Sequence, residues 1–307
     1  MRDQRGFALI LVLLVMAVVG VVGAEFAYSM RLEASAVRAY KQGIVATHLA
    51  EAAVAQATRE LVADAAYVTV DDSGLLTFYT GDRPPLPLPR LPREKVEFPG
   101  GQFSYRITDE DARVNVNTLA PDRIDRLLQG LALDKEVRDT IGDSLQDWRD
   151  ANEEHRLNGA ESDYYLALPV PYRSRNGNLE SVAELLQIRG VTPEIYFGAP
   201  GRPGLADLVT VKSQGQINVN TAAPEVLRAL GLAEAQVDEV VQARAIAPYT
   251  SVPGTLGGVG LTVATSTFRV EAEGLVDGRV AARVTAVIQK RQGTTPSIAI
   301  LAWSWLR

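Results

Sequence analysis

The stretch Phe7–Ala24, FALILVLLVMAVVGVVGA, is an uninterrupted apolar run and decides how the rest of the chain is interpreted. It contains no charged residue, and the first charge after it is Glu25. As a helix it measures about 27 Å at ~1.5 Å per residue, close to the ~30 Å hydrocarbon core of a bilayer. Arg2 and Arg5 precede it, and no comparable basic cluster follows it. The positive-inside rule therefore predicts a single membrane span with the N-terminus in the cytoplasm.

Three interpretations compete for this segment. A secretory signal peptide has a shorter apolar region and then a polar stretch with small residues at a cleavage site, whereas here the small residues lie inside the apolar run. An uncleaved signal anchor fits the hydropathy as well. The short basic leader and the junction between Gly6 and Phe7 resemble the processing site of type IV prepilins. That resemblance implies that a prepilin peptidase removes residues 1–6 after Gly6 and that the apolar stretch stays on the mature protein.

The residues that follow extend the same helix. From Glu25 to Leu61 the chain is rich in Ala, Leu, Glu, Arg and Gln, which favour helices, and no Pro occurs before Pro84. Small and apolar residues recur at three- and four-residue steps, which predicts an amphipathic helix with a small-residue stripe. We therefore expect one rod over residues 7–61 that can bundle with similar helices. The stripe comprises Leu32, Ala36, Ala39, Gly43, Ala46, Ala50, Ala53 and Ala57.

Length and composition limit the remaining possibilities. The 307 residues suffice for about two domains at ~150 residues each. The absence of Cys excludes disulfides and thiolate metal sites. A formal net charge of −6 argues against a non-specific nucleic-acid binder, so no nucleic-acid partner is expected. The two His residues, His48 and His155, form no metalloprotease motif, and no nucleophile elbow occurs, so we expect no enzymatic activity.

Alternating apolar and polar residues predict strands on both sides of a helical region. Short strands are predicted at 67–70, 75–80 and 103–108, and the Pro-rich segment 81–92 is predicted to be a loop. Near the C-terminus, 267–274 and 280–290 flank an Asp-Gly turn and predict a hairpin, followed by a strand at 298–305. The pattern between Thr108 and about Pro248 is helical. The predicted fold class is α+β, with a helical domain inserted into a strand-rich domain.

The helical region contains an internal repeat. Arg113–Asp122, RVNVNTLAPD, is echoed by Gln216–Glu225, QINVNTAAPE, and each copy leads into a helical pattern. The Asn pairs can close side-chain turns, and Thr118 and Thr221 are predicted N-caps. Such segments resemble helix-hairpin-helix modules, many of which bind DNA through a Gly-x-Gly turn with basic neighbours. The candidate turns at Gly130, Gly190 and Gly231 each have one Gly and no basic residue after it, which favours a scaffold for protein contacts.

The segment between Asp143 and Asp163 is dense in carboxylates and amides, with Gly159 permitting a sharp turn. Hard oxygen ligands at short spacing suit Ca²⁺, which takes six to eight oxygens in a flexible geometry. The spacing is not that of an EF-hand, and a solvated acidic loop is the alternative. His155 is a poor ligand for a hard cation. The predicted calcium ligands are Asp147, Asp150, Asn152, Glu161 and Asp163.

Taken together, these features resemble the K-type minor pseudopilins of the type II secretion (general secretion) pathway over nearly the whole chain. The order and spacing of the motifs carry the resemblance. They are the Gly6–Phe7 junction, DEDARVNVNT (109–118), DWRDAN (147–152), NGAESDYY (158–165), YRSRNG (172–177), SVAELL (181–186) and INVNT (217–221).

The resemblance implies a type IV pilin-like fold: a long N-terminal helix packed on an antiparallel sheet, interrupted by a large helical domain of sterile-alpha-motif-like or helix-hairpin-helix-like type. It places the leader at 1–6, the pilin-like domain at 62–108 and 262–307, and the insert at 109–261. It also implies bound calcium, an inner-membrane anchor and a periplasmic C-terminal part. The implied partners are the I- and J-type minor pseudopilins at the pseudopilus tip, other pseudopilins, the prepilin peptidase and the inner-membrane assembly platform.

The resemblance also bears on the fifth residue of the expected mature helix. Most pilin-like subunits carry Glu at the fifth mature position, where it is thought to pair with the N-terminal amine of the subunit ahead. Counted from Phe7, the fifth residue here is Leu11. An unpaired carboxylate in an apolar stretch costs several kcal/mol, so Leu suits a subunit with nothing ahead of it.

Two other functions remain open at the level of sequence. A type IV pilus minor pilin would have the same leader and rod. A membrane-anchored DNA-uptake protein would use the helix-hairpin-helix elements instead.

Overall fold

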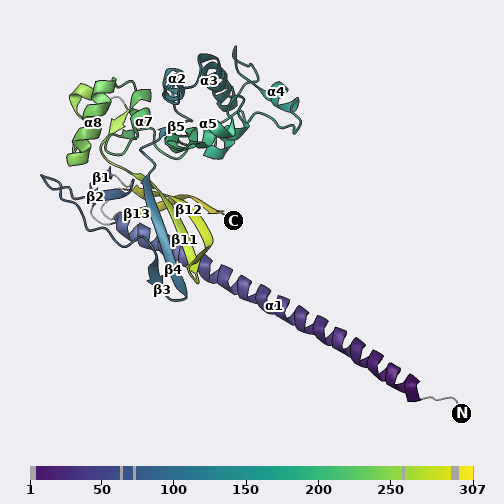
Figure 1. The fold of residues 1–307 in the computed structure, drawn as a ribbon. Coiled ribbons are helices and arrows are strands. Elements are labelled where there is room, and N and C mark those ends of the chain that lie inside the picture. Colours follow the sequence, from purple (N-terminus) through teal and green to yellow (C-terminus); the bar gives the residue numbers. More distant parts are fainter. Residues whose placement is uncertain (1–4, 63–64, 72–73, 258–259, 292–296, 307) are drawn as a thin grey trace.

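One helix dominates the shape of the molecule. The computed structural model describes residues 5–62, 65–71, 74–257, 260–291 and 297–306. Helix α1 (Arg5–Val62) runs unbroken for 58 residues, and its N-terminal half projects alone from the globular part (Figure 1). This confirms the predicted rod, while residues 1–4 of the predicted leader lie outside the described residues.

The C-terminal half of α1 packs on a five-stranded sheet in which every neighbouring pair of strands is antiparallel. The order across the sheet is β13-β12-β11-β4-β3, so β13 and β3 are its edges. The predicted pilin-like plan, a long helix on an antiparallel sheet, is confirmed. The strands are β3 (Val96–Phe98), β4 (Gly101–Asp109), β11 (Thr267–Val276), β12 (Arg279–Arg291) and β13 (Ser297–Leu306).

Small residues allow α1 to lie close to the sheet. Ala46, Ala50, Ala53 and Ala57 are fully buried on the helix face toward the strands. Gly274 on β11 is equally necessary, because a Cβ there would lie 1.9 Å from the carbonyl oxygen of Ala46. Phe, Tyr, Val and Ile side chains of β4, β11 and β12 complete this core with Leu49, Val54 and Leu61 of α1.

Two smaller features join the helix to the sheet. Strands β1 (Tyr67–Val70) and β2 (Leu76–Tyr79) form the first predicted hairpin, although Asp72 and Ser73 of its turn lie outside the described residues. The Pro-rich segment 81–92 is a loop, as predicted, and is followed by Arg93, which forms a buried ion pair with Glu60 of α1. The hairpin between β11 and β12 turns at Asp277 and Gly278, which both have positive φ as a type I′ turn requires.

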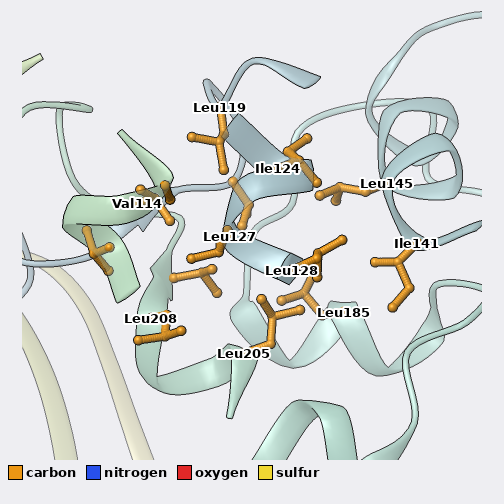
Figure 2. Close-up of a cluster of buried hydrophobic side chains, with 14 of the residues drawn as sticks. Val114, Leu119, Ile124, Leu127, Leu128, Ile141, Leu145, Leu185, Leu205 and Leu208 are labelled. Carbon is orange, nitrogen blue, oxygen red and sulfur yellow. The ribbon is translucent and has the colours of Figure 1, made fainter. Parts of the chain in front are cut away.

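The helical domain is inserted between β4 and β11 and lies at the end of the sheet opposite the projecting helix (Figure 1). It has its own core of Leu, Ile, Val and aromatic side chains, part of which is drawn in Figure 2. Its helices are α2 (Pro121–Gly130), α3 (Lys135–Arg149), α4 (Ser162–Leu166), α5 (Pro193–Phe197), α6 (Leu205–Leu208), α7 (Pro224–Ala229) and α8 (Glu234–Ile246), with 3₁₀ turns at Val182–Gln187 and Gly254–Leu256. Its short strands are β5 (Val114–Asn115), β6 (Gly198–Ala199), β7 (Arg202–Pro203), β8 (Val209–Thr210), β9 (Ile217–Asn218) and β10 (Leu261–Thr262).

The sequence repeat is also a structural repeat. Asn115 and Asn218 each accept a hydrogen bond from the backbone N–H two residues on, which are the side-chain turns predicted for these Asn residues. The second Asn of each copy then bonds both backbone groups of a distant residue, Asn117 with Leu179 and Asn220 with Tyr249.

An arginine completes each copy of the repeat. Arg149, the last residue of α3, donates to the carbonyls of Val116 and Leu119. Arg244 of α8 donates to the corresponding carbonyls, those of Val219 and Ala222.

The prediction that Thr118 and Thr221 cap the following helices is wrong. The N-cap residues are Ala120 and Ala223, and neither provides a side-chain hydrogen bond. The Thr118 hydroxyl turns back toward the carbonyl of Asn115 instead, and the Thr221 hydroxyl donates to the carboxylate of Asp109. Pro at the first helical position removes one N–H that would otherwise need a cap.

Three consecutive carboxylates connect the two domains where β4 enters the insert. Asp109 accepts hydrogen bonds from Asn218, Thr221 (2.5 Å) and Thr265 (2.6 Å). Glu110 pairs with Arg113 and Arg269, and Asp111 accepts from Ser266 and from the backbone N–H of Thr267. Burial, followed by the neighbouring Asp111 carboxylate, raises the pKa of Asp109 to about 7.

Gly274→Ala should destabilise the packing of α1 on the sheet, because the new methyl group would collide with the backbone at Ala46. We expect the free energy of unfolding of the full chain to fall by about 1–3 kcal/mol, the usual cost of overpacking. Gly43→Ala is the matched control: a Cβ there meets no atom within 4 Å, and Ala favours the helix. Equal stability of Gly274→Ala and wild type in chemical denaturation would contradict the close approach.

Asp109→Asn should flatten part of the pH dependence of stability. A carboxyl group whose pKa is raised in the fold stabilises the protein fully below its unfolded pKa of about 3.9, and this contribution is lost as pH rises toward 7. The unfolding temperature of the wild type should therefore fall more between pH 5 and 8 than that of the variant. Asp82→Asn, on an exposed loop, should retain the wild-type slope. Identical slopes for wild type and Asp109→Asn would refute the assignment.

Candidate functional site

The first candidate site is the free half of α1. From Phe7 to Lys41 the residues of α1 are exposed, so the predicted assembly residues Phe7 and Leu11 face outward. This is the one helix of the described chain that is long and apolar enough to cross a membrane, as judged by length and composition. The helix therefore carries an apolar surface that the protein itself does not cover, which suits a lipid bilayer or other helices.

The second candidate site is the acidic loop between α3 and α4. Its two ends are held by aromatic side chains, because Trp148 of α3 packs edge-on against Tyr165 of α4 at 5.2 Å. Tyr172 stacks on Tyr165, also at 5.2 Å, and lies 6.3 Å from Trp148, so the three rings form one cluster. Arg189 lies over the ring of Tyr164 and donates to the carbonyl of Gly159. A rigid aromatic base therefore fixes where the loop begins and ends.

Asp147 lies at the centre of this loop and is completely buried. The Arg156 guanidinium contacts its Oδ1 at 2.5 Å and reaches Oδ2 of Asp150 at 2.8 Å with the same nitrogen. The Arg156 backbone N–H also donates to Asp147. Gly159 crosses directly above, and a Cβ there would lie 1.8 Å from Oδ2 of Asp147. Only Gly allows the loop backbone to fold this closely over the carboxylate.

Glu161 is the most unusual group of the loop. Its side chain is 1% exposed, and neither carboxylate oxygen has a hydrogen-bond partner in good geometry among the described residues. The nearby Ser174 hydroxyl is engaged with Ser162 at 2.8 Å. Burial raises the pKa of Glu161 to about 7, and the charges of Asp147 and Asp150 add to the shift. A cation beside Glu161 would remove this electrostatic penalty.

The remaining predicted ligands lie on the surface. Asn152 donates to Oδ1 of Asp150 at 2.7 Å, and Asp163 accepts from the N–H of Tyr164. Across the described ranges, no three Asp, Glu or His side chains are gathered closely enough to hold a metal ion. The structure therefore brings Asp147 and Asp150 together around Arg156, places Glu161 near them, and leaves Asn152 and Asp163 exposed.

The sequence interpretation missed two residues that shape this loop. Arg156 is a basic residue inside a run of carboxylates, and that contrast was the available signal for an internal ion pair. Glu153 accepts from Ser162 and Asn176 and so connects the loop to a segment further along the chain. No sequence pattern indicated the contact between Glu153 and Asn176, because it depends on the fold of residues 166–176.

The helical hairpins were the third candidate, as a nucleic-acid interface. The turn after α2 and the turn after α7 lie beside Arg126 and Arg228. Arg126 pairs with Asp122 at 3.1 Å, and Arg228 pairs with Glu234 at 2.7 Å. These turns therefore present arginines whose charge is already compensated, which does not favour binding of a phosphate backbone.

Comparisons with known proteins address the identity of the chain. Two family models described as "Type II secretion system (T2SS), protein K" match residues 106–198 and 217–270. The type II secretion system protein K of Pseudomonas aeruginosa is 29% identical over 329 aligned residues, covering 98% of this chain and 92% of that protein. The protein of the same name from Pectobacterium carotovorum is 31% identical over 112 residues, covering 32% of this chain and 34% of its own length.

A solved structure supports the same fold. The matching chain belongs to the GspK-GspI-GspJ complex of the type 2 secretion system from enterotoxigenic Escherichia coli. It aligns with a TM-score of 0.58 and 21% identity, covering 71% of this chain and 84% of that one. The two family matches fall on the inserted domain and its return into β11, and the fold agrees with the long helix and antiparallel sheet described above. The chain therefore belongs to the family of type II secretion system protein K.

Proposed function

We propose that the protein is a minor pseudopilin that occupies the tip of the type II secretion pseudopilus and nucleates its assembly. The observation that carries this proposal is Leu11, at the fifth position of the expected mature helix. A subunit that begins a filament has no subunit ahead of it, so a Glu at this place would be an unpaired carboxylate in an apolar environment. Leu avoids that cost. In this role the protein takes part in the export of folded proteins across the outer membrane as a structural component.

The proposed partners are the I- and J-type minor pseudopilins. The structural neighbour is a complex of a K-type subunit with GspI and GspJ, and this chain has the same fold as that K-type subunit. Below the tip complex, the exposed half of α1 would contact other pseudopilins and the inner-membrane assembly platform. The prepilin peptidase would first remove the leader at Gly6.

The proposed orientation follows from the charges around the span. Arg2 and Arg5 precede the apolar run, whereas Glu25 is the first charge after it. The leader would therefore lie in the cytoplasm, and the sheet and inserted domain would lie in the periplasm.

We also propose that the acidic loop binds calcium. Asp147, Asp150 and Glu161 would supply hard oxygen ligands, and the buried, unpartnered carboxylate of Glu161 is the observation that favours a cation there. Arg156 forms ion pairs with Asp147 and Asp150, so its side chain would have to turn away from both carboxylates for calcium to bind. Asn152 and Asp163 would complete the ligand set only after the loop rearranges. Bound Ca²⁺ would supply the positive charge that stabilises the loop.

The tip assignment predicts both the mature N-terminus and the partners of the native protein. Mass spectrometry of the protein from its own membranes should show a chain that starts at Phe7 with a methylated amine. The processed chain should co-purify with the I- and J-type subunits and occur once per pseudopilus. A chain with an intact leader, the absence of a complex with I and J, or a distribution along the whole filament would contradict the proposal.

Calcium should stabilise the full chain. A site that is saturated at about 100 times Kd contributes about 2.7 kcal/mol, so millimolar Ca²⁺ should raise the unfolding temperature by several degrees, and a chelator should reverse the change. Glu161→Gln and Asp147→Asn should abolish the response. Glu154→Gln, an exposed carboxylate of the same loop, should retain it. A response to Ca²⁺ that persists in Glu161→Gln would exclude this residue as a ligand.

A further inference from the structure

The acidic loop between α3 and α4 contains its own counterion, Arg156 (Figure 1). Nη1 of Arg156 lies 2.5 Å from Oδ1 of Asp147 and 2.8 Å from Oδ2 of Asp150, so one guanidinium nitrogen bridges two carboxylates. Asp147 is completely buried, and a buried carboxylate is costly unless a positive charge compensates it. The contacts of Arg156 therefore help to keep the loop folded around Asp147.

The compensation by Arg156 is incomplete. Its guanidinium serves both Asp147 and Asp150, and these two carboxylates act electrostatically on Glu161 as well. Both carboxylate oxygens of Glu161 are buried without a hydrogen-bond partner among the described residues. Arg149 also interacts electrostatically with Asp150, but its guanidinium is bonded to two loop carbonyls. The loop therefore attracts more positive charge than Arg156 supplies, and a divalent cation would meet this excess.

Calcium and Arg156 would use the same oxygen atoms. Hard carboxylate oxygens are the ligands that Ca²⁺ prefers, and Asp147 and Asp150 direct theirs at the guanidinium of Arg156. The double charge of Ca²⁺ balances the two carboxylates, whereas the single charge of one arginine does not. Binding of the metal to Asp147 and Asp150 therefore requires that both ion pairs with Arg156 break, and it is favoured by the better charge balance.

The position of Arg156 allows its side chain to leave. This side chain is 38% exposed, whereas that of Asp147 is fully buried, so the guanidinium can move into water while the carboxylate stays in place. The backbone N–H of Arg156 donates to Oδ2 of Asp147 at 3.1 Å, and the N–H of Gly159 donates to the carbonyl of Arg156 at 3.0 Å. These backbone contacts do not involve the guanidinium, so the turn that covers Asp147 can persist after the side chain has moved.

We propose that Arg156 competes with Ca²⁺ for Asp147 and Asp150 and thereby sets the calcium concentration at which the loop is loaded. This inference rests on the proposed calcium site. The apparent affinity of a ligand falls with the fraction of molecules whose site is ready to bind it, and the ion pairs of Arg156 reduce that fraction. Arg156 thus gives the loop two compensated forms, one held by the arginine and one held by the metal. The first form keeps the subunit folded when calcium is scarce.

Titration calorimetry of the full chain in detergent micelles, with Ca²⁺ alone as the probe, tests the competition. Arg156→Gln should bind Ca²⁺ roughly ten-fold more tightly than the wild type, because the competing charge is gone. In the presence of a chelator the same variant should unfold at a lower temperature than the wild type, and saturating Ca²⁺ should close most of this gap. Arg228→Gln is the matched control and should leave the calcium affinity unchanged. Arg228 also bridges two carboxylates, those of Glu225 and Glu234, and its side chain is 36% exposed.

Arg156→Lys is a second variant that retains the positive charge, in case the neutral variant does not fold. An ammonium group does not reproduce the contacts of a guanidinium, so the calcium affinity should rise here too, by a smaller factor. If the wild type binds Ca²⁺ and the folded variants bind it equally or more weakly, the competition is wrong while the proposed calcium site stands. If neither the wild type nor the variants bind Ca²⁺, the proposed site fails and the inference fails with it. Binding by the variants alone would contradict the proposed site in the natural chain and support the competition.

Discussion

The close contact between α1 and β11 is the constraint on which the pilin-like half of the molecule depends. The backbone of the helix at Ala46 reaches the backbone of the strand at Gly274, and there is no room for a side chain between them. The fully buried alanines at 50, 53 and 57 keep the helix close to the sheet along this line, while Leu49, Val54 and Leu61 fill the core beside it. Because the alanine side chains are small, they also limit the width of sheet that one helix can cover. It leaves the edge strand β13 uncovered, and so connects the internal packing of the subunit to its outer surface.

The inserted domain follows a different principle, in which polar side chains bond to backbone at long range. Asn117 and Asn220 each hold both backbone groups of a residue more than 25 positions away, and Arg149 and Arg244 each satisfy two loop carbonyls. These bonds hold in place the loops that lead into α2 and α7. A domain with short helices and little regular sheet needs such fixed points, because helices of five to ten residues are not stable alone.

The sequence predicted the elements whose signal is local. The rod, the hairpin at Asp277–Gly278 and the Asn turns of the repeat all depend on neighbouring residues, and each was predicted correctly. The Thr caps were predicted wrongly because each helix begins three residues after the Thr, at Pro121 and Pro224, so that Ala120 and Ala223 occupy the N-cap positions. The bond from Asn218 to Asp109, across more than 100 residues, has no local signature. For the acidic loop the sequence indicated the carboxylates, but not that Arg156 lies between two of them.

The insertion of a whole domain between β4 and β11 has a consequence for how the chain folds. The strand that pairs with β4 is separated from it by more than 150 residues, so the central pairing of the sheet closes a very long loop. Of the strands that bury the alanine face of α1, β4 precedes the inserted domain in the sequence, whereas β11 and β12 follow it. The inserted domain contains its own core, and all of its helices precede β11 in the sequence. Until β11 and β12 join β4 in the sheet, only part of the alanine face of α1 is covered by its own chain, so the final packing of this helix depends on the last strands of the sequence.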